Sequence, residues 1–147
     1  MSFPAFEQFD IAVAEFLAER GACQSPYKAQ KRSDVPAVFV NFMPDTPDKA
    51  IMLRVSSDDR DSDDCNPLLT LTVAFRGDVD DLLSVRAIGE QLFHLLHEPG
   101  QIQLTALQQA LFSRRISKGI EVQDKNRRFV RVDAFQIRPL IPLAKGQ

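Results

Sequence analysis

Residues 68–97 read LLTLTVAFRGDVDDLLSVRAIGEQLFHLLH, and this stretch decides the fold. In its first part, apolar residues alternate with polar or small ones, a period of two that predicts a half-buried strand. In its second part, apolar residues recur at every third or fourth position, which predicts an amphipathic helix. Because the strand leads directly into a long helix, we expect a sheet with a helix packed on one face. The core-facing residues of the strand are Leu69, Leu71, Val73 and Phe75, and those of the helix are Leu82, Val85, Ile88, Leu92 and Leu95, with Leu83, Phe93 and Leu96 widening the stripe.

The junction between this strand and this helix is rich in acidic residues. Gly77 is expected to supply the turn. Asp78, Asp80 and Asp81 follow at the start of the helix, where carboxylates cap free N–H groups and oppose the helix dipole.

The end of the helix carries both histidines of the chain. His94 and His97 are three residues apart, with Glu90 one turn earlier and Glu98 adjacent, a spacing that can hold a metal ion. No second group of ligand residues accompanies them. We therefore interpret the pair as boundary residues near a helix C-terminus, where positive charge is favourable, and predict no metal site.

The segments before this stretch extend the sheet or cover it. A helix is predicted from Pro4 to Arg20, with acidic residues away from its apolar stripe. A loop over 22–35 then leads to strands over 37–42 and 50–55, which are joined by the turn-forming Pro-Asp segment 43–48. The stripe of the helix is Phe6, Phe9, Val13, Phe16 and Leu17.

The segments after the central stretch predict a long hairpin. Residues 102–111 fit either a short strand or a helical turn, and two arms follow over 116–122 and 127–138, with the tip at 124–126. In the second arm the apolar positions shift by one residue after Ala134, which predicts a bulge or a strand buried on both faces. Regular pairing is expected to end at Pro139 and Pro142, and residues 143–147 either to form a flexible tail or to dock on a neighbouring copy.

Together these elements predict an α+β fold. We expect one domain over residues 1–147, with a mostly antiparallel sheet of about four to six strands and two main helices packed on it. The chain has no apolar run long enough to span a membrane, and its N-terminal residues lack the basic start and apolar core of a signal peptide. A cytosolic chain is therefore expected, in which Cys23 and Cys65 are free thiols.

The sequence offers little that points to catalysis. Its six glycines are isolated, so no phosphate-binding loop is predicted, and neither a Gly-x-Ser-x-Gly nor a Cys-x-x-Cys motif occurs. Residues 56–66 hold five aspartates but lack the glycine and glutamate of a calcium loop, which favours an exposed hairpin or edge loop. We expect a protein that is not an enzyme and has no catalytic residues, no cofactor and no bound metal.

Charge is unevenly distributed along the chain. Residues 1–99 carry nine basic and seventeen acidic side chains, and residues 100–147 carry nine basic and three acidic ones. The two parts could attract each other within one molecule or between copies. The basic residues crowd the C-terminal hairpin, and a basic ribbon can also follow the phosphates of a nucleic acid.

Three short phrases of this sequence resemble phage minor capsid and tail-terminator proteins. The phrases are MPDTPDKAIML at 43–53, VAFRGD at 73–78 and VDAFQI at 132–137, and the resemblance extends over residues 3–140. It implies a small fold with helices on a mostly antiparallel sheet. It also implies a structural protein that caps the tail tube as a ring, commonly a hexamer, and offers a surface for joining the tail to the head. The expected partners are other copies of the chain, the tail tube protein, a head-completion protein and DNA that passes through the ring, with no membrane. The expected location is the virion tail of a phage or prophage, and the host cytoplasm during assembly.

Ring closure requires that one patch of a subunit meet a different patch of the next. We therefore expect an acidic surface of one copy to lie near the basic hairpin of its neighbour, or the hairpin to face DNA in the ring. A nucleic-acid-binding module that uses this hairpin without sequence preference is the alternative function. The basic contact residues are Arg114, Arg115, Lys118, Arg127, Arg128 and Arg131, and the acidic ones are Asp58, Asp59, Asp61, Asp63, Asp64, Asp78, Asp80 and Asp81.

Overall fold

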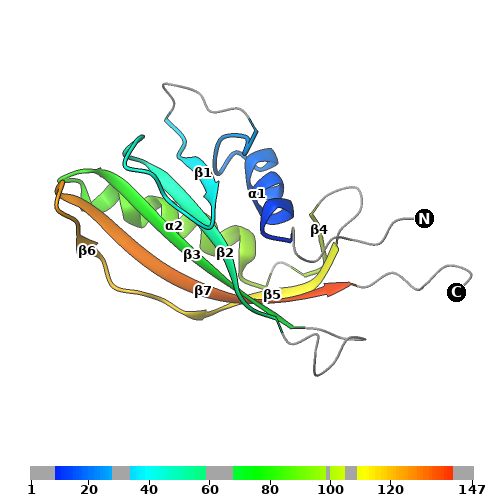
Figure 1. Cartoon of the computed structure of the whole chain (residues 1–147). Coiled ribbons are helices and arrows are strands. Elements are labelled where there is room, and N and C mark those ends of the chain that lie inside the picture. Colours follow the sequence, from blue (N-terminus) through cyan, green and yellow to red (C-terminus); the bar gives the residue numbers. More distant parts are fainter. Residues whose placement is uncertain (1–8, 28–33, 59–67, 99, 105–108, 141–147) are drawn as a thin grey trace, which may run out of the picture.

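The computed structural model describes residues 9–27, 34–58, 68–98, 100–104 and 109–140 of the 147-residue chain. Figure 1 shows helices packed on a curled sheet. The elements, in chain order, are α1 (Phe9–Glu19), β1 (Ala37–Val40), β2 (Ala50–Asp58), β3 (Leu69–Val79), α2 (Leu82–Leu96), β4 (Ile102–Gln103), β5 (Gln109–Ser117), β6 (Val122–Gln123) and β7 (Arg128–Leu140).

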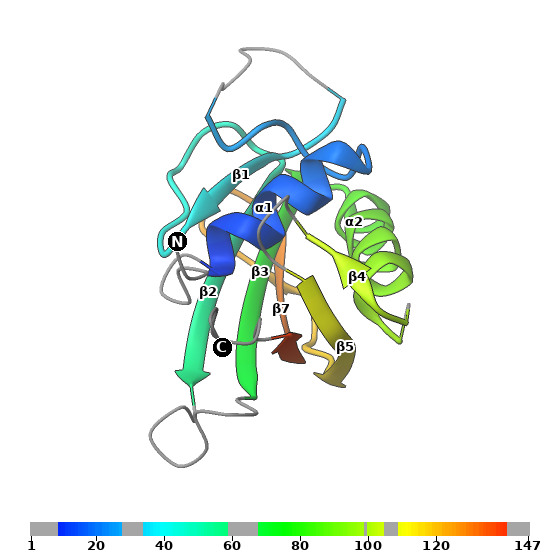
Figure 2. The same cartoon turned by 90° about the vertical axis from the view of Figure 1, so that its right-hand side faces the viewer.

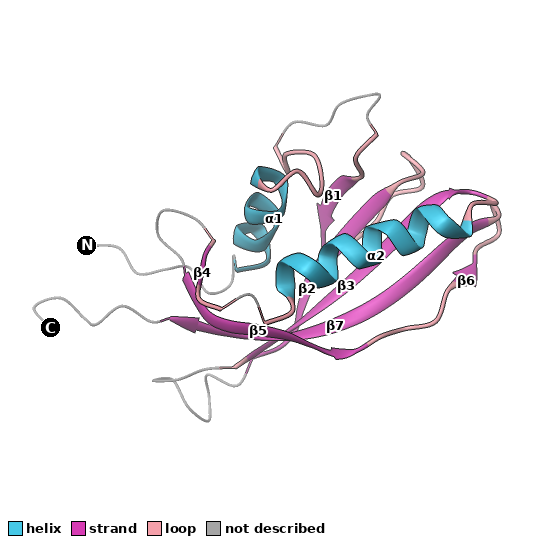
Figure 3. Ribbon diagram, turned by 180° about the vertical axis from the view of Figure 1, so that it is seen from behind, coloured by secondary structure: helices cyan, strands magenta, loops and turns pink. Residues whose placement is uncertain are grey.

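The sheet is mixed and mostly antiparallel. Its strand order is β1-β2-β3-β7-β5-β4, with β6 also paired to β7, and only the β1–β2 pair is parallel. Both helices pack on the same face of the sheet, as the view from behind in Figure 3 shows. The expected α+β architecture is confirmed, and the short strands β4 and β6 bring the described sheet to seven strands.

β3 lies at the centre of the sheet, between β2 and β7. All four apolar residues of its predicted core face are fully buried, and they face both helices in one continuous core. Burying a side chain of this size contributes about 1.5–3 kcal/mol. The strand predicted from the alternating pattern is therefore confirmed as the main support of the core.

Gly77 does not form the turn that was expected at this position. β3 continues through Gly77 to Val79, and the chain turns at Asp80, which has a φ angle of 54°. A Cβ atom at Gly77 would collide with the Ser84 hydroxyl and would lie 2.7 Å from the Val85 backbone nitrogen. Glycine is required here because the first turn of α2 packs directly against the strand.

The stripe of α2 is narrower than the sequence predicts. Val85, Ile88, Leu92 and Leu96 are buried, whereas Leu83 is 73% exposed and lies outside the core. Leu82 and Leu95 are partly buried against the core. A charged group also packs against this helix. The Arg131 guanidinium occupies the space beside Gly89.

The apolar stripe of α1 packs against the core as predicted, but one acidic residue of the helix is buried as well. Phe9, Val13, Phe16 and Leu17 are buried, whereas Phe6 lies outside the described residues. Asp10 is also buried, contrary to the expectation that acidic residues lie away from the core. Its carboxylate accepts a hydrogen bond from the Ile11 backbone N–H at 2.8 Å, and burial raises the pKa of this carboxyl group.

The phase shift predicted in the last strand is absent. In β7 the buried positions run without interruption through Arg131, Asp133, Phe135 and Ile137 to Pro139. The irregular residues lie on the neighbouring strands instead, between Arg76 and Val79 of β3 and at two places in β5. The apolar pattern changes because a charged pair takes two of the core-facing positions. Pro139 pairs with Ala110 inside the strand and does not end it, and Pro142 lies outside the described residues.

The remaining predictions concern short segments. Residues 102–103 are a strand and not a helical turn, and the hairpin arm predicted over 116–122 is divided into the end of β5, a connection at 118–121 and β6. β2 extends into the polar stretch as far as Asp58, and residues 59–66 are not described. Neither described helix is both long and apolar enough to cross a membrane.

Candidate interaction surfaces

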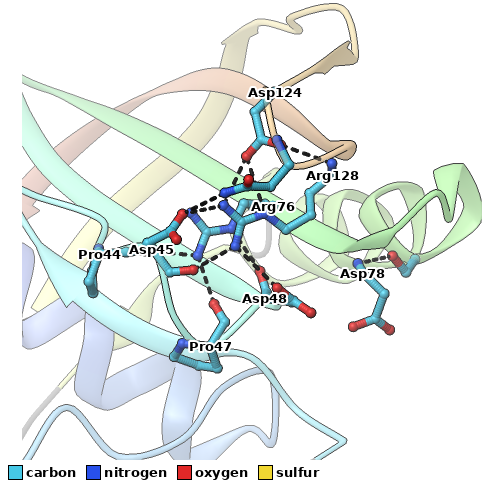
Figure 4. A network of polar contacts seen from close by, with 10 residues as sticks. Pro44, Asp45, Pro47, Asp48, Arg76, Asp78, Asp124 and Arg128 are labelled. Carbon is cyan, nitrogen blue, oxygen red and sulfur yellow. Dashed lines mark hydrogen bonds and ion pairs between the residues drawn. The ribbon is translucent and has the colours of Figure 1, made fainter.

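Arg76 fixes the Pro-Asp segment to the centre of the sheet. This arginine is 4% exposed and lies on the face of β3 opposite the helices. Its guanidinium donates to three backbone carbonyl oxygens, those of Pro44 at 2.8 Å, Pro47 at 2.7 Å and Asp48 at 2.8 Å (Figure 4). The pKa of Arg76 is lowered by burial and by the neighbouring Arg128. The arginine therefore acts as a tie between β3 and the turn.

Arg128 completes the same network from the start of β7. It is 3% exposed and forms ion pairs with Asp45 at 2.6 Å, with Asp124 at 3.0 Å and with Asp48 at 3.1 Å. It also donates to the Asp45 carbonyl oxygen at 2.6 Å. The hydrogen bond from Arg128 lowers the pKa of Asp45. The pKa of Asp124 is lowered as well, because hydrogen bonds from Arg128 outweigh the effect of burial.

This network connects two of the three phrases that carry the resemblance. Pro44, Pro47 and Asp48 belong to the first phrase and Arg76 to the second, and the hydrogen bonds of Arg76 place the two phrases in direct contact. Arg128 pairs with Asp45 and Asp48 of the first phrase. We define these residues, with Asp124, as the arginine clamp. Arg128 donates through all three of its guanidinium nitrogens and Arg76 through two of them, in each case to partners within the chain, so the clamp holds the fold together and is not an open binding site.

A second network lies under the connection between β5 and β6. Asp133 is 1% exposed and pairs with Arg131 at 2.8 Å and with Arg115 at 3.6 Å. Its carboxylate also accepts a hydrogen bond from the Gly119 backbone N–H at 3.0 Å. Above this network, a groove of about 630 Å³ separates α2 from residues 118–121. Arg86 and Arg131 both reach Glu121 across it, each at 3.4 Å.

The basic residues predicted to touch a neighbour therefore divide into two groups. Arg128 and Arg131 are buried and paired within the chain, and Arg127 pairs with Asp80 at 3.3 Å. Arg115 pairs with Asp133 and stacks over the Phe93 ring at 4.3 Å. Arg114 and Lys118, together with Lys125 at the hairpin tip, are exposed and form no ion pair with another described residue, whereas Arg127 is exposed but paired.

The predicted acidic surface also has partners inside the molecule. Asp78 pairs with Lys49 at 3.6 Å, and Asp80 accepts a hydrogen bond from Gln123 at 3.1 Å. Asp81 alone is the N-cap of α2, where its carboxylate accepts the Ser84 backbone N–H at 3.2 Å. The side chain of Asp58 is not described, and Asp59, Asp61, Asp63 and Asp64 lie outside the described residues.

The two histidines do not form a metal site with other described residues. His94 is exposed and pairs with Glu90 at 3.0 Å. His97 stacks on Phe93 and accepts the Arg115 backbone N–H at its Nδ1 atom, at 3.1 Å. No group of three metal-ligating side chains is found among the residues that the structure describes. Cys23 is a buried free thiol, and burial raises its pKa to about 12.

The two edges of the sheet differ in whether their outer backbone groups have hydrogen-bond partners, and the sequence did not predict this difference. β1 forms one edge (Figure 2). Its Ala37 and neighbouring Asn41 donate to the backbone oxygens of Lys49 and Leu53 in β2, so the N–H and C=O groups of Val38 and Val40 face away from the sheet. No described residue pairs with that side of β1. This edge is open.

The opposite edge is covered. β4 is only two residues long, and beyond it the end of α2 protects β5. Glu98 donates its backbone N–H to the Ser113 carbonyl oxygen at 2.7 Å, and His97 accepts from Arg115 as described above. A strand can therefore be added at β1 but not along this part of β5.

An apolar pocket of about 270 Å³ lies beside the open edge. Tyr27 and Phe42 border it and are 68% and 63% exposed, and the Tyr27 hydroxyl is held by Glu15. The pocket has no charged lining residue; it is formed by Ile11, Pro26, Tyr27, Val38, Phe39, Val40 and Phe42. We call the open edge of β1 and this pocket the β1 groove.

A second group of exposed apolar side chains lies at the other side of the sheet, around residues 116–122. Ile120 is 79% exposed and Val122 57% exposed, and Ile116 and Val132 are also exposed. Gly119 approaches the Val132 backbone so closely that a side chain would not fit. We call these four residues the β5–β6 patch.

The sequence matches none of the protein-family models against which it was scanned and no curated protein in the search.

Proposed function

We propose that this chain is a phage tail-completion protein, a structural subunit that caps the tail tube as a homo-oligomeric ring and forms the surface that joins tail to head. The observation that carries the proposal is the presence, on one chain, of two unlike apolar surfaces that no described residue covers. The β1 groove lies at one edge of the sheet and the β5–β6 patch near the other. A ring requires heterologous contacts between different patches, and such a pair of surfaces suits them.

The arrangement of the three resemblance phrases also supports the proposal. The first two meet in the arginine clamp, and the third forms the part of β7 that pairs with β3. The short phrases therefore correspond to residues that hold this fold together. The fold itself, a mostly antiparallel sheet with two helices on one face, agrees with the fold that the resemblance implies.

Ion pairs within the chain change which residues we expect at the contacts between subunits. Arg127, Arg128 and Arg131 pair with acidic residues of their own chain, so they contribute little free charge to a neighbour. We propose that subunit contacts depend mainly on exposed apolar side chains. Arg114, Lys118 and Lys125 supply the exposed positive charge that could meet an acidic partner or DNA inside the ring.

Labelling of tail tubes tests this function directly. Gold-labelled chain is mixed with tubes assembled from the tail tube protein of the same phage and viewed by electron microscopy. We expect label at one end of each tube and shorter, more uniform tubes when the chain is present during assembly. Label along the tube walls, or none on tubes, would contradict the proposal.

Nucleic-acid binding remains the alternative, and the exposed Arg114, Lys118 and Lys125 favour it. A gel-shift titration with random DNA at several salt concentrations tests this function. Binding that weakens steeply with salt, and whose salt dependence is reduced when the three residues are replaced by glutamine, supports the alternative. Equal behaviour of the variant and the wild-type chain contradicts it.

A further inference from the structure

We propose that the β1 groove binds residues Ile141–Ala144 of a second copy of this chain, which add as an edge strand beside β1. The proposal rests on the ring assembly proposed above and identifies one of its contacts. The chain would thus extend a C-terminal arm into the sheet of its neighbour.

The β1 groove has the two features that strand addition requires. The outward N–H and C=O groups of Val38 and Val40 provide hydrogen-bonding partners along the edge. The adjoining pocket provides space for apolar side chains, with Tyr27 and Phe42 at its border. In this mode of recognition, backbone hydrogen bonds supply affinity and pockets for alternate side chains supply specificity.

The arm has a matching sequence. Residues 141–144 read IPLA and carry no charge, and the side chains that line the pocket carry no charge either. In an added strand, Ile141 and Leu143 point to the same face and bond to the same side. If this side is β1 and the added strand runs antiparallel to it, both side chains lie on the same face as Val38 and Val40, which line the pocket. Pro142, which lacks an N–H group, then faces away from the sheet, as proline does in edge strands.

The arm is too short to reach the groove of its own chain. Ile137 and Asp58 both lie opposite Leu69, and β1 pairs only with residues 50–53 at the other end of β2. Along the strand direction, Leu140 is therefore about 23 Å from the nearest end of β1, and three strand spacings add about 14 Å across the sheet. Four extended residues reach only about 14 Å beyond Leu140. The occupant must therefore come from another copy.

Cross-linking between single-cysteine variants tests the contact. In a Cys65→Ser background, with Cys23 buried, one batch carries Leu143→Cys and another carries Phe42→Cys. The two batches are mixed and treated with a short bismaleimide. We expect a product of twice the chain mass that requires both cysteines, and at least a tenfold lower yield when Ile120→Cys, in the β5–β6 patch, replaces Phe42→Cys.

A binding measurement separates this contact from ring formation. A fluorescent peptide of residues 138–147 is titrated with the full chain, and its anisotropy is followed. We expect saturable binding that Phe42→Ser weakens about tenfold. A ring that forms while both the cross-link and the peptide binding fail overturns the arm but leaves the proposed function. Peptide binding and cross-linking without any ring support the arm and contradict the ring. If the ring, the cross-link and the peptide binding all fail, both the arm and the proposed function are overturned.

Discussion

At the scale of single residues, Gly77 joins the central strand to the helix that follows it. The backbone of α2 lies where a side chain at this position would project. We expect Gly77→Ala to lower the free energy of unfolding by about 2 kcal/mol or more, because the helix must shift away from β3. Urea denaturation followed by circular dichroism measures this change. Ala87→Ser on the exposed side of α2 is the control and should cost less than about 0.7 kcal/mol.

Arg128 and Arg127 provide a second comparison, because adjacent residues of the same charge have different environments. Arg128 is buried within the arginine clamp, whereas Arg127 is exposed with one carboxylate partner. Arg128→Met leaves three aspartates near one another without their cation, and we expect it to destabilise the chain by about 2 kcal/mol. Arg127→Met should change stability by less than about 0.5 kcal/mol. Equal losses in denaturant titrations would show that the clamp is not a specific network.

The same clamp predicts how stability depends on pH. Arg128 lowers the folded-state pKa of Asp45 and Asp124, so both carboxyl groups stabilise the fold when ionised. This contribution is present above their unfolded pKa of about 4 and is lost as pH falls through the lower folded values. We expect the free energy of unfolding to decrease below about pH 4. The decrease should be smaller in the double variant Asp45→Asn, Asp124→Asn; an unchanged acid limb would contradict the proposed pairing.

At the scale of elements, α2 depends on one cap. Asp81 accepts the Ser84 N–H, whereas Asp80 lies outside the helix and contacts Gln123 and Arg127. We expect Asp81→Ala to destabilise the chain by about 1 kcal/mol, as is typical for loss of an N-cap. The matched variant Asp80→Ala should cost clearly less, and thermal unfolding compares the two. A larger loss of stability for Asp80→Ala than for Asp81→Ala would show that Asp81 is not the residue that caps the helix.

Elements with a regular apolar period could be predicted from the sequence, and those with buried charge could not. β3 and α2 follow their patterns because aliphatic side chains fill the core on both sides of their junction. β7 does not, because Arg131 and Asp133 take positions at which the pattern requires apolar residues. Their mutual neutralisation makes burial possible, and neither residue alone indicates it.

The candidate surfaces show the same limit. Arg128 was expected at an exposed contact, but its partners Asp45 and Asp48 are about eighty positions away in the chain, so their proximity depends on the folded sheet. The open edge at β1 could not be predicted either, because it follows from strand order and from the protection of β5 by the end of α2. Exposed aromatic residues such as Phe42 resemble core residues in the sequence alone.

At the scale of the whole molecule, the proposed function depends on assembly. The described part of one chain leaves two unlike apolar surfaces uncovered, and its buried arginine side chains bind partners within the chain. A monomer would keep both surfaces exposed to water, whereas a closed ring would cover one with the other or with a neighbour's arm.

The molar mass of the purified chain tests this claim most directly. Light scattering coupled to size-exclusion chromatography, over a wide range of protein concentration, gives the mass, and negative-stain imaging of the same fractions gives the shape. We expect a closed ring of about six copies of the 16.5 kDa chain. A mass that stays at 16.5 kDa at every concentration, with no ring in the images, would contradict the claim.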